Sequence, residues 1–335
     1  MTERMPFSPA SHIERIEADM KKALIIGAAG FVGNYLASQI LSEGKWSLAA
    51  TKMKHETLLR DDMEIYDLDL LEPGAVQSLL EQLQPDYIFH LAAQSSVAVS
   101  WKNPGLTVDV NIKGTLAVLD AVRQLDYKPR ILLIGSGEEY GHVEPEEIPI
   151  RETACPRPGN IYAATKACQN MIGKIYADAY GIDLMSVRAF NHIGPNQAPL
   201  FVVADFCKQA AEIEKGIRPP VMNVGNLAAR RDFTDVRDVV RAYILLMEKG
   251  IAGETYNVGS GHAISIEEVL KEILSFVRVT IEVKTDPNKF RPVDVPIIEA
   301  DIKKLQEATG WRPEIGLRET LRETLEYWRN RECGR

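Results

Sequence analysis

The run Ala23-Leu24-Ile25-Ile26-Gly27-Ala28-Ala29-Gly30-Phe31-Val32-Gly33 decides the fold of this chain. Its first four residues are apolar and predict a short buried strand, and residues 34–43 that follow have the pattern of a helix. The glycine spacing between them is G-x-x-G-x-x-G, which lets backbone N–H groups approach a pyrophosphate at the positive end of the helix. Strand, glycine turn and helix in this order predict a dinucleotide-binding unit.

Strands and helices alternate after this unit. Further strands are expected at residues 47–51, 63–70, 87–91 and 131–134, and helices at residues 73–83 and 104–125. Such alternation implies right-handed crossovers and a parallel sheet whose ligands bind at the carboxyl ends of the strands. We therefore predict an α/β, Rossmann-type doubly wound sheet, with Ala92, Ala93 and Ser136 on the same rim as the glycine turn.

The end of the second strand bears on the choice of cofactor. Thr51-Lys52-Met53-Lys54 stands where the general dinucleotide fingerprint has an acidic residue for the ribose 2′-hydroxyl. Two lysines without a carboxylate favour a 2′-phosphate, so NADP(H) is the expected cofactor and NAD(H) is the alternative. An ordinary charged loop is the other explanation of these residues.

A tyrosine and a lysine lie one helical turn apart in Ile161-Tyr162-Ala163-Ala164-Thr165-Lys166, with Asn160 as the expected N-cap. A cation about 6 Å from a phenol, at an effective dielectric constant near 20, favours the phenolate by roughly 3 kcal/mol. We therefore expect Lys166 to lower the pKa of Tyr162 by about two units, which would make Tyr162 a general acid or base. A surface tyrosine and a solvated lysine are the commoner explanation for such a pair taken alone.

The composition excludes several classes of function. The chain has 335 residues, 45% of them apolar, and a net charge of 39 − 47 = −8, which argues against general affinity for nucleic acid or for an anionic membrane. No apolar run approaches the ~18 residues that span a bilayer, and residues 1–20 lack a signal-peptide pattern. A soluble, cytoplasmic protein is expected. The four cysteines form no C-x-x-C pair and have no histidine at ligand spacing, so reduced thiols and no metal site are expected.

The second half of the chain must supply the substrate pocket. Helices are expected at residues 201–214, 236–248, 265–276 and 317–328, and extended segments at 219–224, 255–258 and 280–283. Arg231 and Arg291 stand beside glycine or proline turns in this acidic chain, where two guanidinium groups could bind a diphosphate. Ion pairs with Asp232 and Asp294 are the alternative explanation.

Six motifs occur together in one order: G-A-A-G-F-V-G, H-L-A-A, S-G-E-E-Y-G, Y-A-A-T-K, R-A-F-N-H-I-G-P and R-D-F-T-D-V-R-D-V. Over about residues 22–328 the chain thus resembles the extended short-chain dehydrogenase/reductases that act on nucleotide sugars. Three segments, at residues 94–97, 190–195 and 290–296, are most similar to those of GDP-4-dehydro-6-deoxy-D-mannose reductases. GDP-mannose 4,6-dehydratases are the near relatives.

The resemblance implies roles for individual residues. Ser136 would hydrogen-bond the C4 oxygen of the sugar, Tyr162 would be the catalytic tyrosine, and Lys166 would hold the nicotinamide ribose. Together with the residues discussed above, the expected cofactor contacts are Gly27, Gly30, Phe31, Val32, Gly33, Thr51, Lys52, Asp69, Leu70, Leu91, Ala92, Ala93, Tyr162 and Lys166. The expected substrate contacts are Gln94, Ser136, Glu138, Asn191, Asn226, Arg231, Arg291 and Asp294.

The expected reaction is reduction of the C4 keto group of GDP-4-dehydro-6-deoxy-D-mannose by NAD(P)H to GDP-D-rhamnose, or to its C4 epimer. The alternative is a GDP-mannose 4,6-dehydratase, with Glu138 as the base that takes the C5 proton. Gly137, in place of a hydroxyl residue, and the pair Phe31-Val32, in place of a Gln-Asp type of pair, favour the reductase. Another nucleotide-sugar epimerase or reductase, or a non-catalytic NADP sensor, are the remaining alternatives; a sensor would usually have lost the tyrosine or the lysine.

The expected organisation has three parts. Residues 1–20 form an N-terminal extension, residues 21–190 with 232–258 form the dinucleotide-binding domain, and residues 191–231 with 259–335 bind the nucleotide sugar. The resemblance also implies a homodimer, in which residues 104–125 and 162–180 of each subunit form a four-helix bundle.

Overall fold

Seven parallel strands form the central sheet of the computed structural model, which describes residues 20–290 and 295–331. The spatial order is β10-β6-β5-β4-β1-β2-β3, so the order reverses between β1 and β4. This sheet confirms the predicted α/β, doubly wound fold. Its strands are β1 (Lys22–Ile26), β2 (Ser47–Lys52), β3 (Glu64–Asp67), β4 (Tyr87–His90), β5 (Arg130–Ser136), β6 (Leu184–Ala189) and β10 (Thr255–Val258).

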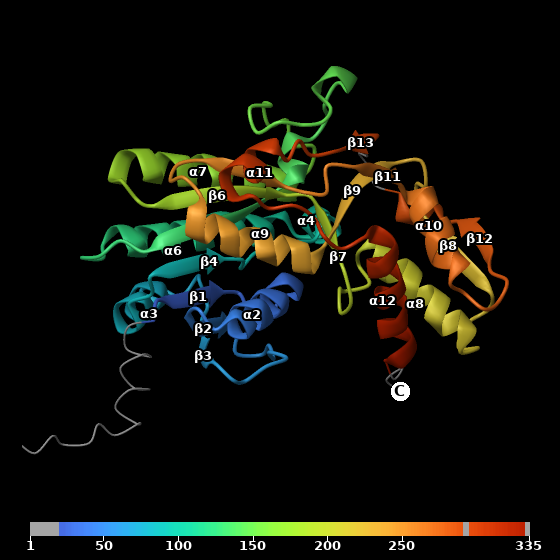
Figure 1. Ribbon diagram of the computed structural model, residues 1–335, viewed down its shortest axis with the longest axis horizontal. Coiled ribbons are helices and arrows are strands. Elements are labelled where there is room, and N and C mark those ends of the chain that lie inside the picture. The colour runs from blue at the N-terminus through green and yellow to red at the C-terminus, as the bar shows by residue number, and fades with distance from the viewer. Residues whose placement is uncertain (1–19, 291–294, 332–335) are drawn as a thin grey trace, which may run out of the picture.

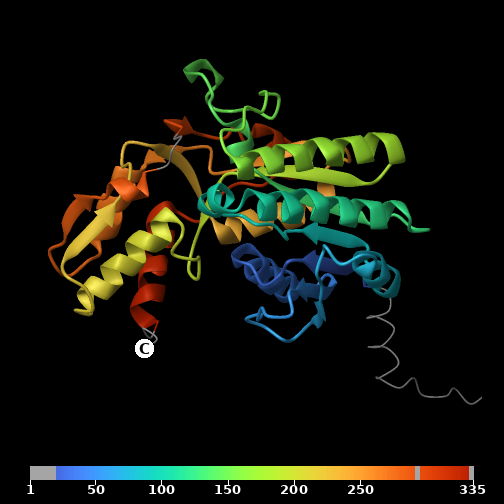
Figure 2. The ribbon, with the colours of Figure 1, turned by 180° about the vertical axis from the view of Figure 1, so that it is seen from behind.

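Helices cover both faces of this sheet (Figures 1 and 2). One face carries α2 (Phe31–Glu43), α9 (Val236–Lys249) and α11 (Lys303–Thr309). The other face carries α3 (Ala75–Leu83), α6 (Gly114–Arg123) and α7 (Ile161–Tyr180). Neighbouring strand residues point to opposite faces, so that Ile25 packs in the first cluster and Leu24 in the second. This two-sided burial explains why the strands are almost wholly apolar.

The expected helix over residues 104–125 is divided. After α4 (Val97–Lys102), α5 (Pro104–Val108) leads into a π-helical turn (Asp109–Lys113) and then into α6. Asn111 lies in this turn with its side chain fully buried. π-Turns within α-helices often mark functional sites, and here the turn aims an amide toward the rim of the sheet.

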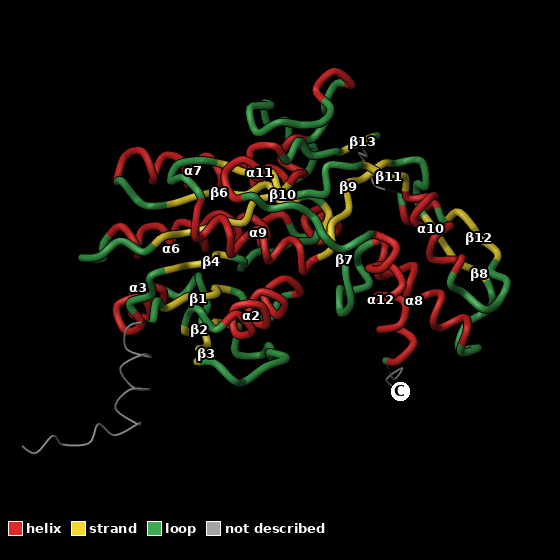
Figure 3. The backbone as a smooth tube through the Cα atoms, viewed as in Figure 1, coloured by secondary structure: helices red, strands yellow, loops and turns green. Residues whose placement is uncertain are grey.

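The second region lies at one end of the sheet and combines short strands with helices (Figure 3). Strand β9 (Arg230–Asp235) pairs with β7 (Asn191–Ile193), β11 (Ala263–Ser265) and β13 (Ile297–Ile298). A separate pair joins β8 (Val221–Val224) to β12 (Glu282–Thr285). Helices α8 (Val202–Glu214), α10 (Ile266–Ser275) and α12 (Leu317–Asn330) bury a third apolar cluster. Elsewhere in the chain and in this region, short 3₁₀ turns occupy Gly137–Tyr140, Pro145–Glu147 and Pro287–Lys289.

Local sequence signals predicted the three long helices and strands β8 and β12 of this region with small errors. Helix α10 begins after Ser265, as expected, and the Ser265 hydroxyl and Glu268 form a capping box there. Strand β12 lies two residues later than the expected segment 280–283. Strands β6, β7, β9, β11 and β13 and helix α11 carried no prediction, because short strands within mixed sequence have no clear period. The division of the chain into two domains stays a prediction.

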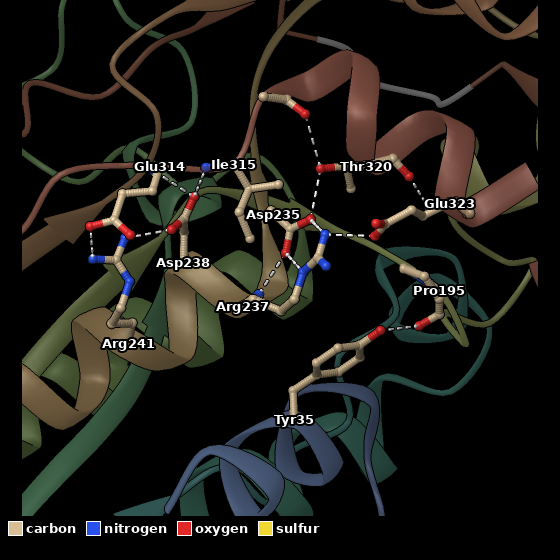
Figure 4. A network of polar contacts seen from close by, with 12 residues as sticks. Tyr35, Pro195, Asp235, Arg237, Asp238, Arg241, Glu314, Ile315, Thr320 and Glu323 are labelled. Carbon is tan, nitrogen blue, oxygen red and sulfur yellow. Dashed lines mark hydrogen bonds and ion pairs between the residues drawn. The ribbon is translucent and has the colours of Figure 1, made fainter. Parts of the chain in front are cut away.

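A buried polar network ties the C-terminal helix α12 to α9 (Figure 4). Asp235 is the N-cap of α9 and accepts hydrogen bonds from the Arg237 backbone N–H at 2.8 Å and from the Thr320 hydroxyl of α12 at 2.7 Å. Nearby, the Tyr35 hydroxyl of α2 donates to the Pro195 carbonyl at 2.9 Å. These contacts attach the second region to the sheet that carries the glycine turn.

None of the helices within residues 20–290 and 295–331 combines the length and the apolar character that crossing a membrane requires.

Candidate active site

The three glycines of the turn between β1 and α2 differ in how much space a side chain would have there. Gly27 has φ +87°, and a Cβ there would lie 2.6 Å from the Ala92 backbone. A Cβ on Gly33 would lie 2.5 Å from the Ala28 carbonyl oxygen. Gly30 has no such neighbour, since its nearest atom would be the Gly27 carbonyl oxygen at 3.7 Å. Gly27 and Gly33 are therefore required by the fold, whereas Gly30 keeps open the space in front of the helix.

Side chains on two other elements hold this turn. Thr51, at the end of β2, accepts a hydrogen bond from the Gly27 N–H through its hydroxyl at 3.1 Å, and its carbonyl accepts from the Ala28 N–H at 2.8 Å. Asn34 donates to the Gly30 carbonyl at 2.9 Å, and its amide oxygen accepts from the Leu59 N–H at 3.1 Å. Sequence reasoning missed Asn34, because nothing in the local pattern shows that a helical asparagine points back at the turn.

The start of α2 is suited to an anionic group. No acidic residue lies in its first turn and no side chain caps it, so the first N–H groups of the helix are left for a ligand. The open position at Gly30 lies directly before these groups. Together they fit the pyrophosphate of a dinucleotide, as the sequence predicted.

The lysine expected at a 2′-phosphate is paired in the structure. Lys52 Nζ lies 2.6 Å from Asp67 of the adjacent strand β3, and Asp67 is directly opposite in register. After β3, Asp69 accepts from the Leu71 N–H and forms a turn, while Leu70 is buried against Gly114. These residues all lie at the carboxyl edge of the sheet.

The loop after β4 is fastened to the π-helical turn. The N–H groups of Leu91 and Ala92 donate to the Ile26 carbonyl, which sets Ala92 and Ala93 beside the glycine turn. Asn111 accepts from the Gln94 N–H at 2.8 Å and donates to the Thr165 hydroxyl of α7 at 2.9 Å.

Gln94, predicted to contact substrate, uses its side chain locally. Its amide donates to the Thr107 hydroxyl at 2.9 Å and to the Ser96 carbonyl at 3.1 Å. His90, at the end of β4, is buried and bonds Thr115, and burial lowers the pKa of this imidazole to about 3. The histidine is therefore neutral, in keeping with a packed strand residue rather than a catalyst.

Ser136, Tyr162 and Lys166 meet at the carboxyl end of β5. Ser136 is the last residue of β5, and its hydroxyl accepts from the Glu138 N–H at 3.2 Å and hydrogen-bonds the Tyr162 phenol. Asn160 caps α7 by accepting from the Ala163 N–H at 2.8 Å, as predicted, and donates to the Glu138 carboxylate at 3.3 Å. Tyr162 lies in the first turn of α7 and is buried.

The predicted effect of Lys166 on the pKa of Tyr162 is wrong for this structure. Burial raises the pKa of the phenol, the hydrogen bond with Ser136 lowers it, and the charges of Glu138 and Glu139 raise it further, so that the phenol is protonated at neutral pH. Lys166 Nζ instead donates to the Ile134 carbonyl at 2.6 Å and to the Gln169 amide oxygen at 3.1 Å. Helical spacing placed the two side chains on one face but could not show that the lysine extends to the strand.

Lys166 is itself strongly affected by its surroundings. It is 3% exposed, and burial lowers the pKa of its ammonium to about 8, while the charge of Glu139 raises it. A lysine with this pKa remains mostly charged at pH 7 within an apolar environment. Such perturbed groups gather at functional sites.

The remaining substrate residues lie in the second region. Asn191 begins β7, opposite Phe233 of β9. Asn226 accepts from the Ala228 N–H at 3.0 Å, and Arg231 is buried and donates to the Val295 carbonyl at 2.7 Å. The predicted substrate residues Arg291 and Asp294 lie outside the described residues.

The second region also contacts the glycine turn directly. The ring of Phe31 stacks on His192 of β7, with centroids 6.1 Å apart and planes at 15°. Phe31 also packs edge-on against Tyr35 at 5.5 Å. The expected cofactor and substrate segments are therefore joined through an aromatic contact, and Phe31 stands between them.

The described residues contain no group of three or more histidine, cysteine, aspartate or glutamate side chains arranged to hold a metal ion.

Residues 24–324 match the protein family described as GDP-mannose 4,6 dehydratase. Among curated proteins, the GDP-6-deoxy-D-mannose reductase of Pseudomonas aeruginosa is 32% identical over 312 residues, covering 93% of this chain and 98% of that protein. The GDP-mannose 4,6-dehydratase of Yersinia enterocolitica is 30% identical over 350 residues, covering 91% of this chain and 93% of that protein.

Solved structures show the same similarity. The structure of RMD from Pseudomonas aeruginosa complexed with NADPH superimposes with a TM-score of 0.81 at 32% identity and covers 92% of this chain and 99% of that one. The Thermus thermophilus UDP-glucose 4-epimerase complex with NAD gives a TM-score of 0.82 at 31% identity, covering 92% and 99%. The two dinucleotides held in these structures are the two that the sequence predicted.

A methyl group at Gly30 should impair dinucleotide binding without harming the fold. Gly30→Ala is expected to change the free energy of unfolding by less than about 1 kcal/mol, because its φ of −67° suits alanine and no protein atom is close. The dissociation constant for NADPH should rise at least about tenfold, since the methyl enters the space before the helix. Fluorescence titration with NADPH measures this dissociation constant. Gly316→Ala, at an equally open glycine before α12, is the control, and equal NADPH affinity in both variants would contradict the assignment.

Burial of the Lys166 ammonium should make stability depend on pH. Below pH 8 the lysine is charged in both the folded and the unfolded protein, so burying the charge lowers the free energy of unfolding. Between about pH 8 and the ordinary pKa of 10.5, only the unfolded chain keeps the proton, so the free energy of unfolding rises with pH. The unfolding free energy of Lys166→Met minus that of the wild type should therefore fall by about 2 kcal/mol from pH 7 to pH 10. Urea denaturation measures this, with exposed Lys102→Met as the control. A constant difference would refute it.

Proposed function

The chain belongs to the GDP-mannose 4,6 dehydratase family, and from this we propose that it reduces the C4 keto group of GDP-4-dehydro-6-deoxy-D-mannose to GDP-D-rhamnose. The observation that carries the proposal is the meeting of Ser136, Tyr162 and Lys166 at the carboxyl end of β5. These residues lie on the edge of the sheet where the glycine turn suits a dinucleotide.

NADPH, or NADH as the alternative, supplies the hydride. The Ser136 hydroxyl, oriented by the Glu138 N–H, donates a hydrogen bond to the C4 oxygen and shares the charge that develops there. Tyr162 donates its proton to this oxygen. The raised pKa of Tyr162 suits the task, since the phenol carries its proton at neutral pH and an alkoxide is a much stronger base than a phenolate.

Lys166 has a different role from the proton donor. Its buried ammonium, fixed by the Ile134 carbonyl and Gln169, lies one turn along α7 from the phenol. There it would hold the ribose of the nicotinamide, as the resemblance to the family implies. The lysine therefore contributes by positioning the cofactor rather than by lowering the pKa of Tyr162.

Gly137 supports the reductase over the 4,6-dehydratase. A Cβ on Gly137 would lie 3.1–3.2 Å from the ring of Phe190, which packs over this position. A hydroxyl side chain, which dehydratases usually carry here, would therefore require Phe190 to shift. The dehydratase remains the second candidate, because Glu138 lies beside Ser136 and is contacted by Asn160. Its carboxylate would serve as the base that dehydration needs.

Stoichiometry of the cofactor distinguishes the two reactions. With the 4-keto sugar nucleotide, the protein should consume one NADPH for each sugar reduced, followed by absorbance at 340 nm and by chromatography. With GDP-mannose and no added reductant it should produce nothing. Tyr162→Phe should lower kcat by about 10²–10⁴-fold, because the proton donor is lost. Tyr180→Phe, at the exposed end of the same helix, should be unaffected. Turnover of GDP-mannose alone would establish the dehydratase instead.

The pairing of Lys52 bears on the choice between NADPH and NADH. Because Lys52 is already paired with Asp67, a 2′-phosphate would share this lysine with a carboxylate, so we propose a preference for NADPH with NADH still accepted. Arg231 and Asn226 lie in the second region, where we propose that the diphosphate and nucleoside bind, together with Arg291 and Asp294. A cytoplasmic location remains a prediction from the sequence.

The α7 surface supports the proposed homodimer. Met171 and Ile175 lie one turn apart on α7 and are 59% and 60% exposed, and Leu106 and Val108 of the adjacent α5 are also exposed. Figure 2 shows α6 and α7 side by side on this face. An apolar surface shared by neighbouring helices suits a four-helix bundle between two copies.

Charges on this surface should separate the dimer. Met171→Glu combined with Ile175→Glu is expected to reduce the mass measured by light scattering from twice the chain mass to 37.4 kDa. The like charges would face one another across the two-fold axis and would be buried there. Ile217→Glu, at an exposed apolar residue of the α8–β8 turn, is the control and should stay dimeric. A wild-type protein that is already monomeric would refute the assembly.

A further inference from the structure

A fully buried carboxylate beside Ser136 takes no part in the reaction described above. Glu139 is 0% exposed. Its Oε1 accepts from the Ser136 N–H and from Asn170 Nδ2, both at 2.8 Å. Its Oε2 accepts from Asn170 Nδ2 at 2.7 Å and from Arg188 Nε at 2.9 Å. Every one of these donors comes from a different element of the dinucleotide-binding sheet and its helices.

The partners of Glu139 connect the catalytic elements. Ser136 ends β5, and Arg188 belongs to the adjacent strand β6. Asn170 is on α7, one turn after Lys166 and two turns after Tyr162, so these three side chains share one face of the helix. A single carboxylate therefore joins the strand that carries the serine to the helix that carries the tyrosine and the lysine.

The surroundings leave Glu139 little freedom. A Cβ on Gly135 would lie 2.4 Å from Glu139 Oε1, so this position must be glycine for the carboxylate to lie there. Arg188 is itself fixed, since its Nη1 donates to the Tyr140 hydroxyl at 3.0 Å and to the Glu152 carbonyl at 3.1 Å. A buried charge without partners is costly, so the carboxylate and its donors hold one another in this arrangement.

We propose that Glu139 is the positioning residue of the active site, which sets the Ser136 hydroxyl against the Tyr162 phenol by holding the Ser136 backbone and helix α7 together. Glu139 Oε1 accepts from the Ser136 N–H, and the Ser136 hydroxyl accepts from the Glu138 N–H at 3.2 Å. Both the backbone and the side chain of the serine are therefore fixed by hydrogen bonds. Glu139 does not touch the substrate. This inference rests on the proposed function, because it assigns Ser136 and Tyr162 to the same reacting oxygen.

Glu139→Gln is the sharpest variant. It keeps the size of the side chain but turns one acceptor oxygen into an NH₂ donor facing donors from Asn170 and Arg188 or Ser136. We expect kcat to fall about 10–100-fold, because a shift of about 1 Å at a reacting group has an effect of this order. The dissociation constant for NADPH should stay within about twofold, since the glycine turn is separate. Glu146→Gln, at an exposed glutamate of a nearby loop, should change neither quantity.

A double-mutant cycle separates positioning from a general loss of structure. If Glu139 acts through Ser136, then adding Glu139→Gln to Ser136→Ala should lower kcat by less than about twofold further. Multiplicative losses in the double variant would show that Glu139 acts independently of the serine and would overturn the proposal. Asn170→Ala, which removes two hydrogen bonds but leaves the Arg188 pair, should reproduce the loss of kcat to a smaller degree. It is the variant to use if Glu139→Gln does not fold.

Crystal structures make the test independent of the substrate. Compared with the wild type under the same conditions, Glu139→Gln or Asn170→Ala should change the separation of the Ser136 and Tyr162 oxygens by about 0.5 Å or more. An unchanged separation would overturn the positioning role even if the enzyme proved active. A changed separation in a protein that fails to reduce the keto sugar would instead contradict the proposed function alone.

Discussion

Parallel pairing along the central sheet is the constraint on which the site depends. All seven strands run in one direction, so the ends of β1, β2, β4 and β5 lie along one edge. Right-handed crossovers return each helix so that α2 and α7 begin at that same edge. Residues from Gly27 to Lys166 are thereby collected on one rim of the sheet, and the second region then attaches to it through Phe31, His192 and the network around Asp235.

Buried charge is the second feature of this protein. Lys166, Glu139 and Arg188 are all buried around the end of β5, and each makes hydrogen bonds to the backbone or to neighbouring side chains. Such groups cost folding free energy relative to apolar residues of the same size. Proteins keep arrangements of this kind where function needs a charge in a fixed position, at some expense of stability. The Lys166 ammonium is an example, because burial lowers its pKa to about 8 although the charge of Glu139 raises it.

Much of the fold followed from local patterns. The glycine turn, strands β2 and β4 and the caps at Asn160 and Ser265 all depend on residues close together in the chain. The proposed active-site residues Ser136, Tyr162 and Lys166 came from motifs whose joint order is specific. The error over the pKa of Tyr162 has a clear cause: spacing predicts which side chains share a face, whereas burial and the Ile134 carbonyl that binds the lysine depend on the neighbouring strand.

By itself, the sequence determined the class of fold and supplied the place proposed for the dinucleotide and the candidate tyrosine and lysine, because each rests on short spacings. Only the tertiary structure decided how those residues are held. Glu139 meets Asn170 and Arg188 across 31 and 49 residues of sequence, and Asn111 meets Thr165 across 54. Such partners cannot be identified from local periodicity, since the chain brings them together only when the strands and helices pack. Because burying an unpaired charge is costly, the Glu139 carboxylate must have hydrogen-bond partners such as Asn170 and Arg188.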